Sequence, residues 1–250
     1  MHYWVCVDDT DMPGTKGTGW LVQNICREME KEGIGTCNPV SRHQLFVHDD
    51  IPFTSHNSAM SFEIDLINGY GEAQLIRRMI NALESRSARG SDPGLCVAGE
   101  IPEEARQRLT TFGRTAKRQI CTKPQAYALA GELGIHLSEH GGTGDGIIGA
   151  VAGIGLRLSG DDGRYRGWYH LGNPGDVVMT STLRAYPFID RLVTEHGRPV
   201  PEGQPVAIGS EKTKTVRLGF QRTLVVKENE TLAETGVRFR TITKEEAKHY

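Results

Sequence analysis

Residues 3–19 read YWVCVDDTDMPGTKGTG. The first six residues of this stretch are mostly apolar and end in an acid, as expected of a buried strand with a polar exit. A glycine-rich loop follows. Apolar Val22, Ile25 and Met29 then recur at spacings of three and four, which predicts a helix over residues 19–32. A strand, an acidic loop and a helix start thus lie in direct succession.

Three carboxylates stand where the predicted strand ends. Asp8, Asp9 and Asp11 repel one another unless a cation or hydrogen-bond donors keep them ionised. Mg²⁺ prefers carboxylate oxygens together with water and substrate phosphate. We therefore predict that these aspartates hold Mg²⁺, while Lys16 and Gly17 bind phosphate at the helix start. The alternative is a solvated acidic turn whose last threonine caps the helix.

A second glycine-rich stretch, HGGTGDGIIG, covers residues 140–149 and leads into a predicted apolar helix over 147–158. Gly144, Gly146 and Gly149 match the pattern G-x-G-x-x-G, which is weak evidence by itself. No strand is predicted before them and no Gly-Lys-Ser/Thr follows, so a Rossmann site is disfavoured and a Walker-type loop is excluded. Two interpretations stay open: a loop that binds phosphate at the helix start, or glycines that allow tight helix packing.

Two further stretches carry polar or basic residues. Residues 49–58, DDIPFTSHNS, place His56 and Asn57 in a loop, where they either contact substrate or serve turn formation. Residues 212–222, KTKTVRLGFQR, combine four cations with Phe220, which suits either nucleic acid or the solvated face of an edge strand. The histidines show no metal-ligand spacing, so no zinc site is predicted.

The composition is that of an ordinary globular chain: of 250 residues, 38% are hydrophobic and 24% charged, with a net charge of −2. That balance provides no general attraction for nucleic acid. The longest uncharged run, residues 146–156, is too short to span a membrane, and the first residues do not resemble a secretory signal. Scattered cysteines indicate a reducing compartment. We expect a cytoplasmic protein with no membrane partner.

The remaining patterns mix strands and helices without a regular βαβ rhythm, which predicts an α+β fold. A turn-rich segment, residues 197–203, separates a main region, 1–197, from a small β-rich segment, 198–250. In the main region we expect strands over residues 37–48, 58–66 and 95–98 and helices over 71–87, from Pro102 and after Pro124. In the tail we expect strands near 205–208, 214–218, 223–226 and 237–242.

Four blocks stand out in order along residues 1–170. They are the acids of 8–11 with Thr18, residues 51–64 with IPFT and Asn57, residues 92–94 (DPG), and residues 144–155 (GDGIIGAVAGIG). In this order and spacing the blocks resemble archaeal tRNA agmatidine synthetase. That family uses ATP to attach agmatine to the wobble cytidine of an isoleucine tRNA.

The resemblance implies a kinase-like domain and a ferredoxin-like domain within residues 1–197. It also implies that ATP is cleaved to AMP and two phosphates. One phosphoryl group passes to a threonine, and another activates the cytidine carbonyl oxygen that the amine displaces. On this sequence Thr18 matches the phosphorylated threonine. The acidic motif around metal and phosphates matches Asp8, Asp9 and Asp11, and the glycine loop beside the nucleotide matches Gly144, Gly146 and Gly149.

The sequence also departs from the family's pattern. Family members continue into an oligonucleotide-binding barrel and a cysteine zinc ribbon. We expect this sequence to be too short for both domains, and its cysteines lack the spacing of the ribbon. In addition, Gly19 stands where the family has a second threonine. We expect an ATP-dependent ligase or kinase that binds Mg²⁺-ATP and acts on tRNA, or on a smaller carbonyl acceptor with an amine. The alternatives are a nucleotide-binding module without catalysis and an RNA-binding protein that uses residues 212–222.

Overall fold

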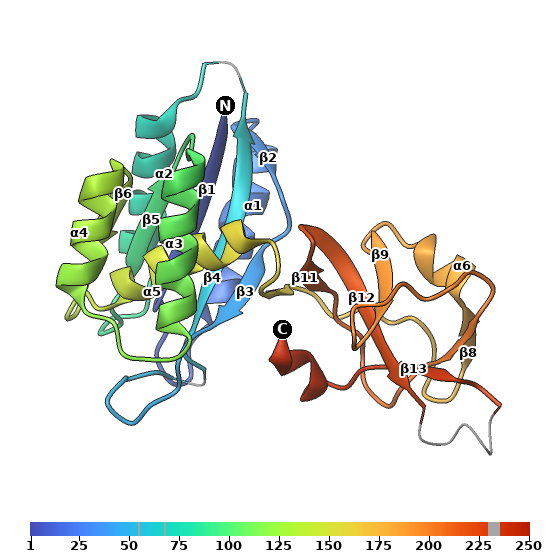
Figure 1. Cartoon of the computed structure of the whole chain (residues 1–250). Helices are drawn as coiled ribbons and strands as arrows, with labels where there is room; N and C mark the ends of the chain where they lie inside the picture. The colour runs from blue at the N-terminus through green and yellow to red at the C-terminus, as the bar shows by residue number, and fades with distance from the viewer. Residues whose placement is uncertain (55, 68, 230–235) are drawn as a thin grey trace. The chain divides into compact units, whose positions relative to one another are not determined.

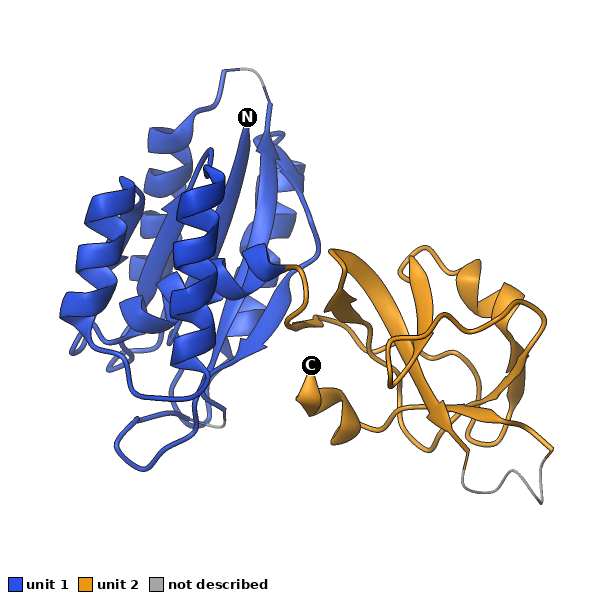
Figure 2. Cartoon of the chain, viewed as in Figure 1, with its two compact units in different colours: residues 1–159 blue, residues 160–250 orange. Residues whose placement is uncertain are grey.

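The computed structural model describes residues 1–54, 56–67, 69–229 and 236–250. They form two compact units, Met1–Ser159 and Gly160–Tyr250, which Figure 2 shows in different colours. The elements of the first unit are β1 (His2–Asp8), α1 (Thr18–Lys31), β2 (Gly35–Cys37), β3 (Ser41–Gln44), β4 (Ser58–Leu66), α2 (Glu72–Arg86), β5 (Gly94–Ala98), α3 (Glu103–Ala116), α4 (Lys123–Leu133), β6 (His136–Glu139) and α5 (Gly146–Ser159).

The first unit is built on an antiparallel sheet of order β6-β5-β1-β4-β3, in which β2 also pairs with β4 (Figure 1). Strand β1 is central because it pairs with β4 on one side and β5 on the other, so that Val5 lies between Phe62 and Val97. A central strand with both faces covered is expected to be nearly all apolar. The strand predicted over residues 3–8 is confirmed, and it ends at Asp8.

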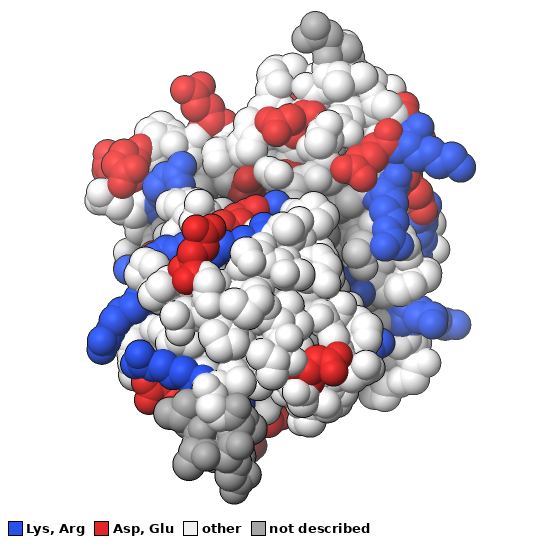
Figure 3. Space-filling view, turned by 90° about the vertical axis from the view of Figure 1, so that its right-hand side faces the viewer, with Lys and Arg blue, Asp and Glu red and all other residues white. Residues whose placement is uncertain are grey.

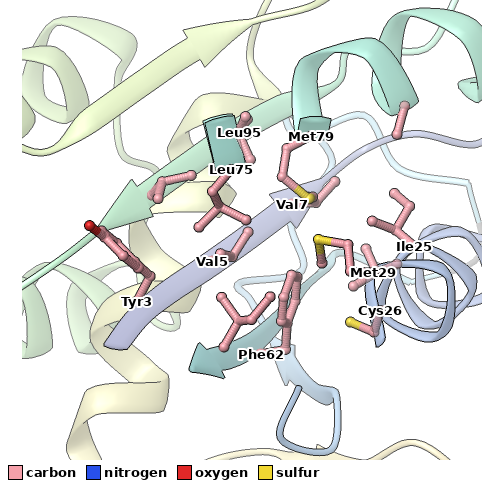
Figure 4. Packing of buried hydrophobic residues seen from close by; sticks show 14 of the residues in the cluster. Tyr3, Val5, Val7, Ile25, Cys26, Met29, Phe62, Leu75, Met79 and Leu95 are labelled. Carbon is pink, nitrogen blue, oxygen red and sulfur yellow. The ribbon is translucent and has the colours of Figure 1, made fainter. Parts of the chain in front are cut away.

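Helices α1 and α2 cover one face of this sheet (Figure 1). Val5 and Val7 alternate toward that face and pack with Ile25 and Met29 of α1 and Leu75 of α2, as Figure 4 shows. All five side chains are buried, and each such burial stabilises the fold by roughly 1.5–3 kcal/mol. The helix spacing that the sequence displays is therefore the spacing of this core.

Helix α5 covers the opposite face, with α3 packed against it. A Cβ atom at Gly153 would overlap Sγ of Cys6 in β1, and one at Gly155 would overlap the carbonyl oxygen of Leu109 in α3. Only glycine allows backbones to approach this closely. Of the two interpretations of these glycines, phosphate binding and tight helix packing, the structure supports tight packing along this part of α5.

The same substitution is expected to have opposite effects at two helical glycines. Gly155→Ala should destabilise the protein by about 1–3 kcal/mol, because the Cβ overlaps a backbone atom that cannot rotate away. Gly131→Ala in α4 should stabilise it by about 0.5–1 kcal/mol, because nothing lies within 4 Å and alanine favours the helix. Urea denaturation of both variants measures the signs. Two changes of the same sign would contradict the packing role of Gly155.

Arg157, near the end of α5, ties this helix to the sheet through a buried polar network. Its Nε donates to Glu63 Oε1 over 2.8 Å, and its Nη1 donates to Ser41 Oγ over 2.7 Å and to the carbonyl oxygens of Pro39 and Ser61. The side chain is only 1% exposed and that of Glu63 13%. A buried charge is tolerated when it is paired and hydrogen-bonded in this way.

Arg157→Met should destabilise the protein by about 3–5 kcal/mol, because it leaves the Glu63 carboxylate buried without its partner. The matched control is Arg86→Met, which removes a 2.7 Å ion pair with Glu28 between side chains that are each more than one third exposed. That change should cost less than about 1 kcal/mol. Equal shifts of the urea midpoint in the two variants would show that the Arg157 pair carries no special weight.

The second unit is made mostly of short strands. Its sheet has the order β7-β11-β12-β13-β10-β8, and β9 pairs with β12. The pairs β10–β13 and β9–β12 are parallel and the others antiparallel. The elements are β7 (Arg164–Tyr165), β8 (Val177–Met179), α6 (Thr180–Arg184), β9 (Arg191–Thr194), β10 (Pro205–Ala207), β11 (Val216–Leu218), β12 (Gln221–Glu228), β13 (Phe239–Thr241) and the 3₁₀ helix η1 (Glu246–His249).

The division between the units lies at residue 159/160, whereas the sequence placed a domain boundary after residue 197. Leu171 and Leu183 share one core cluster with Val206 and Leu224, so residues before and after 197 belong to the same unit. The turn-rich segment 197–203 is an internal loop: Val200 N donates to Leu192 O over 3.2 Å. Its glycines and prolines mark a change of direction within the unit.

Both units together give a mixed α/β chain with mostly antiparallel strand pairing, which agrees with the predicted class. The predicted helices are confirmed to within about two residues, whereas the strand expected over 37–48 is two shorter strands, β2 and β3. Strands β6 to β9 were not predicted from the sequence, because segments of two to four residues are too short to show an alternation of apolar and polar residues. In the part of the chain that the structure describes, no helix is long and apolar enough to cross a membrane.

Candidate active site

The acidic loop begins at the buried end of β1. Asp8 is the last residue of the strand and is 9% exposed. Asp9 follows with a left-handed backbone, φ 52°, and its N–H donates to Asp8 Oδ1 over 2.9 Å. A non-glycine residue in this conformation stores strain of about 1–3 kcal/mol, and such strain clusters at functional sites.

Thr18 is the first residue of α1 and lies at the centre of a hydrogen-bond network. Its Oγ1 donates to Asp11 Oδ1 over 2.8 Å, and its backbone N–H donates to the same oxygen over 3.0 Å. The N–H and the hydroxyl of Thr10 each donate to Thr18 Oγ1 over 3.1 Å. Asp11 therefore caps the helix from outside, and the cap position itself is Gly17, not Thr18. The hydroxyl of Thr18 is fixed in place and points at a carboxylate.

The loop before β4 closes the other side of Asp11. Thr54 Oγ1 donates to Asp11 Oδ2 over 3.0 Å, so both carboxylate oxygens accept hydrogen bonds from threonines. Asn57 in the same loop bonds inward: its Nδ2 donates to Phe46 O over 2.6 Å. Its observed contacts are those of turn formation, and a substrate contact for His56 stays a prediction.

The second glycine-rich stretch reaches the same place. Strand β6 ends directly before it, so a short strand does precede this loop, contrary to the sequence expectation. Gly141, Gly142 and Gly144 have φ of 153°, 53° and 78°, which turns the chain into the start of α5. A Cβ atom at Gly149, in the first turn of α5, would overlap Asp8 Oδ2. The buried carboxylate of β1 thus packs against the glycine start of this helix.

Asp92 joins the two stretches. Its carboxylate accepts hydrogen bonds from the backbone N–H and the hydroxyl of Thr143 in the glycine loop. A Cβ atom at Gly146 would overlap the carbonyl oxygen of Asp92, so glycine is required where α5 begins. Asp92 and Asp145 also raise the pKa of Asp9, because their negative charges disfavour its ionised form. The site therefore contains more carboxylates than the three that the sequence singled out.

Burial is the main reason that the pKa values of two of these carboxyls are raised. It raises the pKa of Asp8 to about 8, with further increases from Asp9 and Asp11 and a smaller opposing effect of Arg42. The pKa of Asp9 rises to about 6, again through burial first and then through the nearby Asp92, Asp11 and Asp145. Clustered carboxylates of this kind favour binding of a cation, which would lower both pKa values.

The fit of this cluster to Mg²⁺ is partial. Among the residues that the structure describes, no group of three or more His, Cys, Asp or Glu converges as a ready metal site. Mg²⁺ needs only one or two protein carboxylates beside water and phosphate, and Asp8 and Asp9 suit that role. Asp11 holds Thr18 and Thr54 with its two oxygens. The three-aspartate metal site stays a prediction.

Lys16 and Gly17 have less direct support as phosphate ligands. The Nζ of Lys16 lies 5.8 Å from the centre of the Trp20 ring, and the side chain is exposed. Gly17 is the cap residue of α1, and the N–H of Thr18, which follows it, already donates to Asp11. The sequence patterns did not identify Thr10 or Arg42 as part of the site, and Thr54 and Asp92 stood out only within longer stretches of sequence.

The fold and this site define a mixed α/β protein in which a strand-end acidic loop meets two glycine-containing helix starts. Solved structures of the tRNA agmatidine synthetase TiaS are similar in fold. The apo structure gives a TM-score of 0.52 at 23% identity, covering 62% of this chain and 35% of that chain. The complex of TiaS with its tRNA and ATP gives 0.53 at 24% identity, covering 62% and 36%. The complex with tRNA, AMPCPP and agmatine gives 0.51 at 24% identity, with the same coverage.

The likeness is one of fold over a part of both proteins. The chain spans about a third of the length of these TiaS structures, and the matched share is about the size of the first compact unit. The N-terminal resemblance expected from the sequence blocks is thereby confirmed. No protein-family model and no curated protein matches the chain.

The stability of the protein should depend on pH through Asp8. Because the pKa of Asp8 is raised from 3.8 to about 8 on folding, the folded state binds this proton more tightly. The contribution of the protonated Asp8 carboxyl to the free energy of unfolding is complete below pH 4 and is lost as the pH rises to 8. In metal-free buffer, Asp8→Asn should therefore gain stability relative to the unsubstituted protein across this range, by a few kcal/mol in order of magnitude.

The comparison variant is Asp9→Asn. Its stability relative to the unsubstituted protein should increase with pH only up to about pH 6, where the folded-state pKa of Asp9 lies. Urea midpoints measured every half pH unit give both differences. A difference between unsubstituted protein and Asp8→Asn that is constant from pH 4 to pH 8 would contradict the burial of this carboxyl.

Proposed function

We propose that the chain is an ATP-dependent phosphoryl-transfer enzyme of the ligase or kinase type, and that Thr18 accepts a phosphoryl group from ATP. The observation that carries the proposal is the 2.8 Å hydrogen bond from the Thr18 hydroxyl to Asp11 Oδ1. Phosphoryl transfer requires mainly positioning and charge neutralisation. The proposal draws further support from the fold likeness to TiaS, whose complexes contain ATP.

Asp11 would serve as the base for this transfer. As the Thr18 oxygen bonds to the γ-phosphorus, Asp11 Oδ1 takes the hydroxyl proton along the existing hydrogen bond, and the bond from the γ-phosphorus to the β–γ bridging oxygen breaks to release ADP. Thr10 donates two hydrogen bonds to the same oxygen and holds it in place, and one of these bonds must be released before an oxygen lone pair can reach phosphorus. Thr54 holds the second oxygen of Asp11, so that the carboxylate cannot rotate away.

The starts of α1 and α5 would bind the phosphates. The space beside Gly144, Gly146 and Gly149 is filled by Glu139, the Asp92 carbonyl and Asp8, so a phosphate would bind through N–H groups of the first helical turns rather than beside these glycines. Lys16 would add a cation at the open side. Mg²⁺, held by Asp8 and Asp9, would neutralise the phosphate charge and lower the pKa of both carboxyls.

The acceptor beyond Thr18 is proposed by analogy. TiaS is seen in complexes with its tRNA and with agmatine, and the corresponding substrates here would be an amine and a carbonyl-bearing acceptor, with tRNA as one candidate. The first unit would be the kinase-like part. The second unit is mostly strands in its described residues, which gives a ferredoxin-like part no specific support. A cytoplasmic location fits a substrate such as ATP.

A second candidate function is nucleotide binding without catalysis, or ligation of small molecules without tRNA. Gly19 replaces the family's second threonine, and it is buried at the second position of α1. If that threonine is needed for transfer, the site would bind ATP and stop there. Thr18 would then act only as a structural partner of Asp11.

Transfer of label from [γ-³²P]ATP tests the proposal. With Mg²⁺, the full chain should become labelled at Thr18, and Thr18→Ala should abolish labelling, whereas Thr18→Ser, which keeps the hydroxyl, should retain it. Asp11→Asn should slow labelling by about 10²–10⁴-fold, the usual contribution of a general base. Thr36→Ala, which alters an exposed threonine of β2, should label normally.

The same reactions with a panel of amines, analysed for AMP and ADP, would distinguish a ligase from a kinase. ATP binding without label or product in any reaction would favour the non-catalytic alternative. Label that persists in Thr18→Ala would overturn the assignment of Thr18.

A further inference from the structure

The second unit displays an exposed tryptophan between two lysines. Trp168 is 44% exposed, and the Nζ atoms of Lys214 and Lys244 lie 4.1 Å and 5.2 Å from the centre of its ring. Both distances are within the range of a cation–π interaction. A large aromatic ring left this exposed contributes little to a core, and two ammonium groups beside it form a local positive site.

The fold holds Trp168 outward by a bulge. Tyr165 N donates to Thr215 O, and Tyr169 exchanges two backbone hydrogen bonds with Thr213, so residues 166–168 stand opposite Lys214 alone. Gly167 in this bulge has φ 128°, a conformation that favours glycine. Lys214 Nζ also donates to Gly167 O over 3.1 Å, which fastens the bulge to the neighbouring segment. The ring and its first lysine are therefore positioned by the backbone.

Lys244 comes from a third segment, between β13 and η1. Its backbone N–H donates to Glu211 Oε2, and its Nζ lies 3.7 Å from Glu211 Oε1. The lysine side chain stays 54% exposed beside this carboxylate. Two ammonium groups and the Glu211 carboxylate thus lie around one ring.

This arrangement differs from the basic strand that the sequence displays over residues 212–222. Arg217 is buried and donates to the Tyr165 hydroxyl over 2.9 Å, so it does not share an outer face with the lysines. Phe220 lies at the turn between β11 and β12, with a left-handed φ of 62°. The aromatic partner of Lys214 comes instead from residue 168, which has no distinctive sequence context.

Figure 3 shows one face of the molecule, on which Lys and Arg are interspersed with Asp and Glu around a large uncharged area. The net charge of −2 provides no long-range attraction either. On the face shown, a polyanion meets no broad basic surface, so a local combination of charge with a stacking surface is needed there. Trp168 with its lysines is such a combination, because a base stacks on the indole while backbone phosphates meet the ammonium groups.

We propose that Trp168, Lys214 and Lys244 form a binding site for a single-stranded polynucleotide. One base stacks on the exposed part of the indole ring that the two ammonium groups leave uncovered, and the phosphates on either side of it contact those ammonium groups. Duplexes are excluded because their bases are already stacked on each other. The site lies in the second unit, so its role does not depend on phosphoryl transfer at Thr18.

Fluorescence anisotropy with a labelled 12-nucleotide strand tests the proposal on the full chain. RNA and DNA strands form separate arms, and a 12-base-pair duplex forms a third. Trp168→Leu should weaken single-strand binding by roughly 5- to 100-fold, the usual loss for one stacked base. The matched control is Trp20→Leu, which removes a ring that is 47% exposed and also has a lysine nearby, and it should leave the affinity unchanged.

Salt dependence tests the two lysines. The double variant Lys214→Gln/Lys244→Gln should reduce the slope of log affinity against log salt by about 1.4, or about 0.7 for each phosphate that a lysine no longer neutralises. Lys248→Gln, which removes one charge from the exposed Lys248–Glu245 pair, should leave the slope unchanged. Circular dichroism confirms that each variant is folded.

Unchanged affinity in Trp168→Leu, equal loss in Trp20→Leu, or no binding of either single strand would each overturn the proposal. Binding that survives saturating ATP and persists in Thr18→Ala separates this site from the proposed active site. A preference for RNA or for DNA identifies which polynucleotide the site takes.

Discussion

The close approach of α5 to the sheet is the constraint on which the first unit depends. Cβ atoms at Gly149, Gly153 and Gly155 would overlap Asp8, Cys6 and Leu109 in turn, so the helix can lie at this distance only with glycine at those positions. Helix α3 then packs on the outside of α5. The same contact that closes the core also brings the start of α5 against the end of β1, and thus places a helix terminus beside the buried carboxylate of Asp8.

That proximity explains the chemistry of the site. A carboxyl that is buried beside other acids favours its neutral form, which is why the pKa of Asp8 rises to about 8 and that of Asp9 to about 6. We propose that Mg²⁺ and a nucleotide phosphate complete this site, because clustered carboxylates favour a cation. The left-handed backbone at Asp9 adds strain at the same point.

The two units differ in how their sequences encode them. In the first unit, helices α1, α2 and α3 carry an apolar stripe, α5 is a nearly continuous apolar run, and the long strand β4 alternates visibly, so these elements are readable from sequence. In the second unit most strands have two to four residues, and pairing partners such as β9 and β12 come from distant segments. A turn-rich segment at 197–203 therefore looks like a domain boundary although it is a loop within one core.

The sequence by itself determined the central strand, the main helices, the acidic loop and its threonine, because each depends on local periodicity or on adjacent residues. Only the tertiary structure decided that Asp11 holds Thr18 and Thr54, that Asp8 meets Gly149, and that Asp92 joins the glycine loop. It also decided that Trp168 meets Lys214 and Lys244. Apart from the Asp11–Thr18 contact, which spans seven residues, these contacts join residues that are far apart in the chain, and side-chain chemistry at such separations is set by packing rather than by pattern.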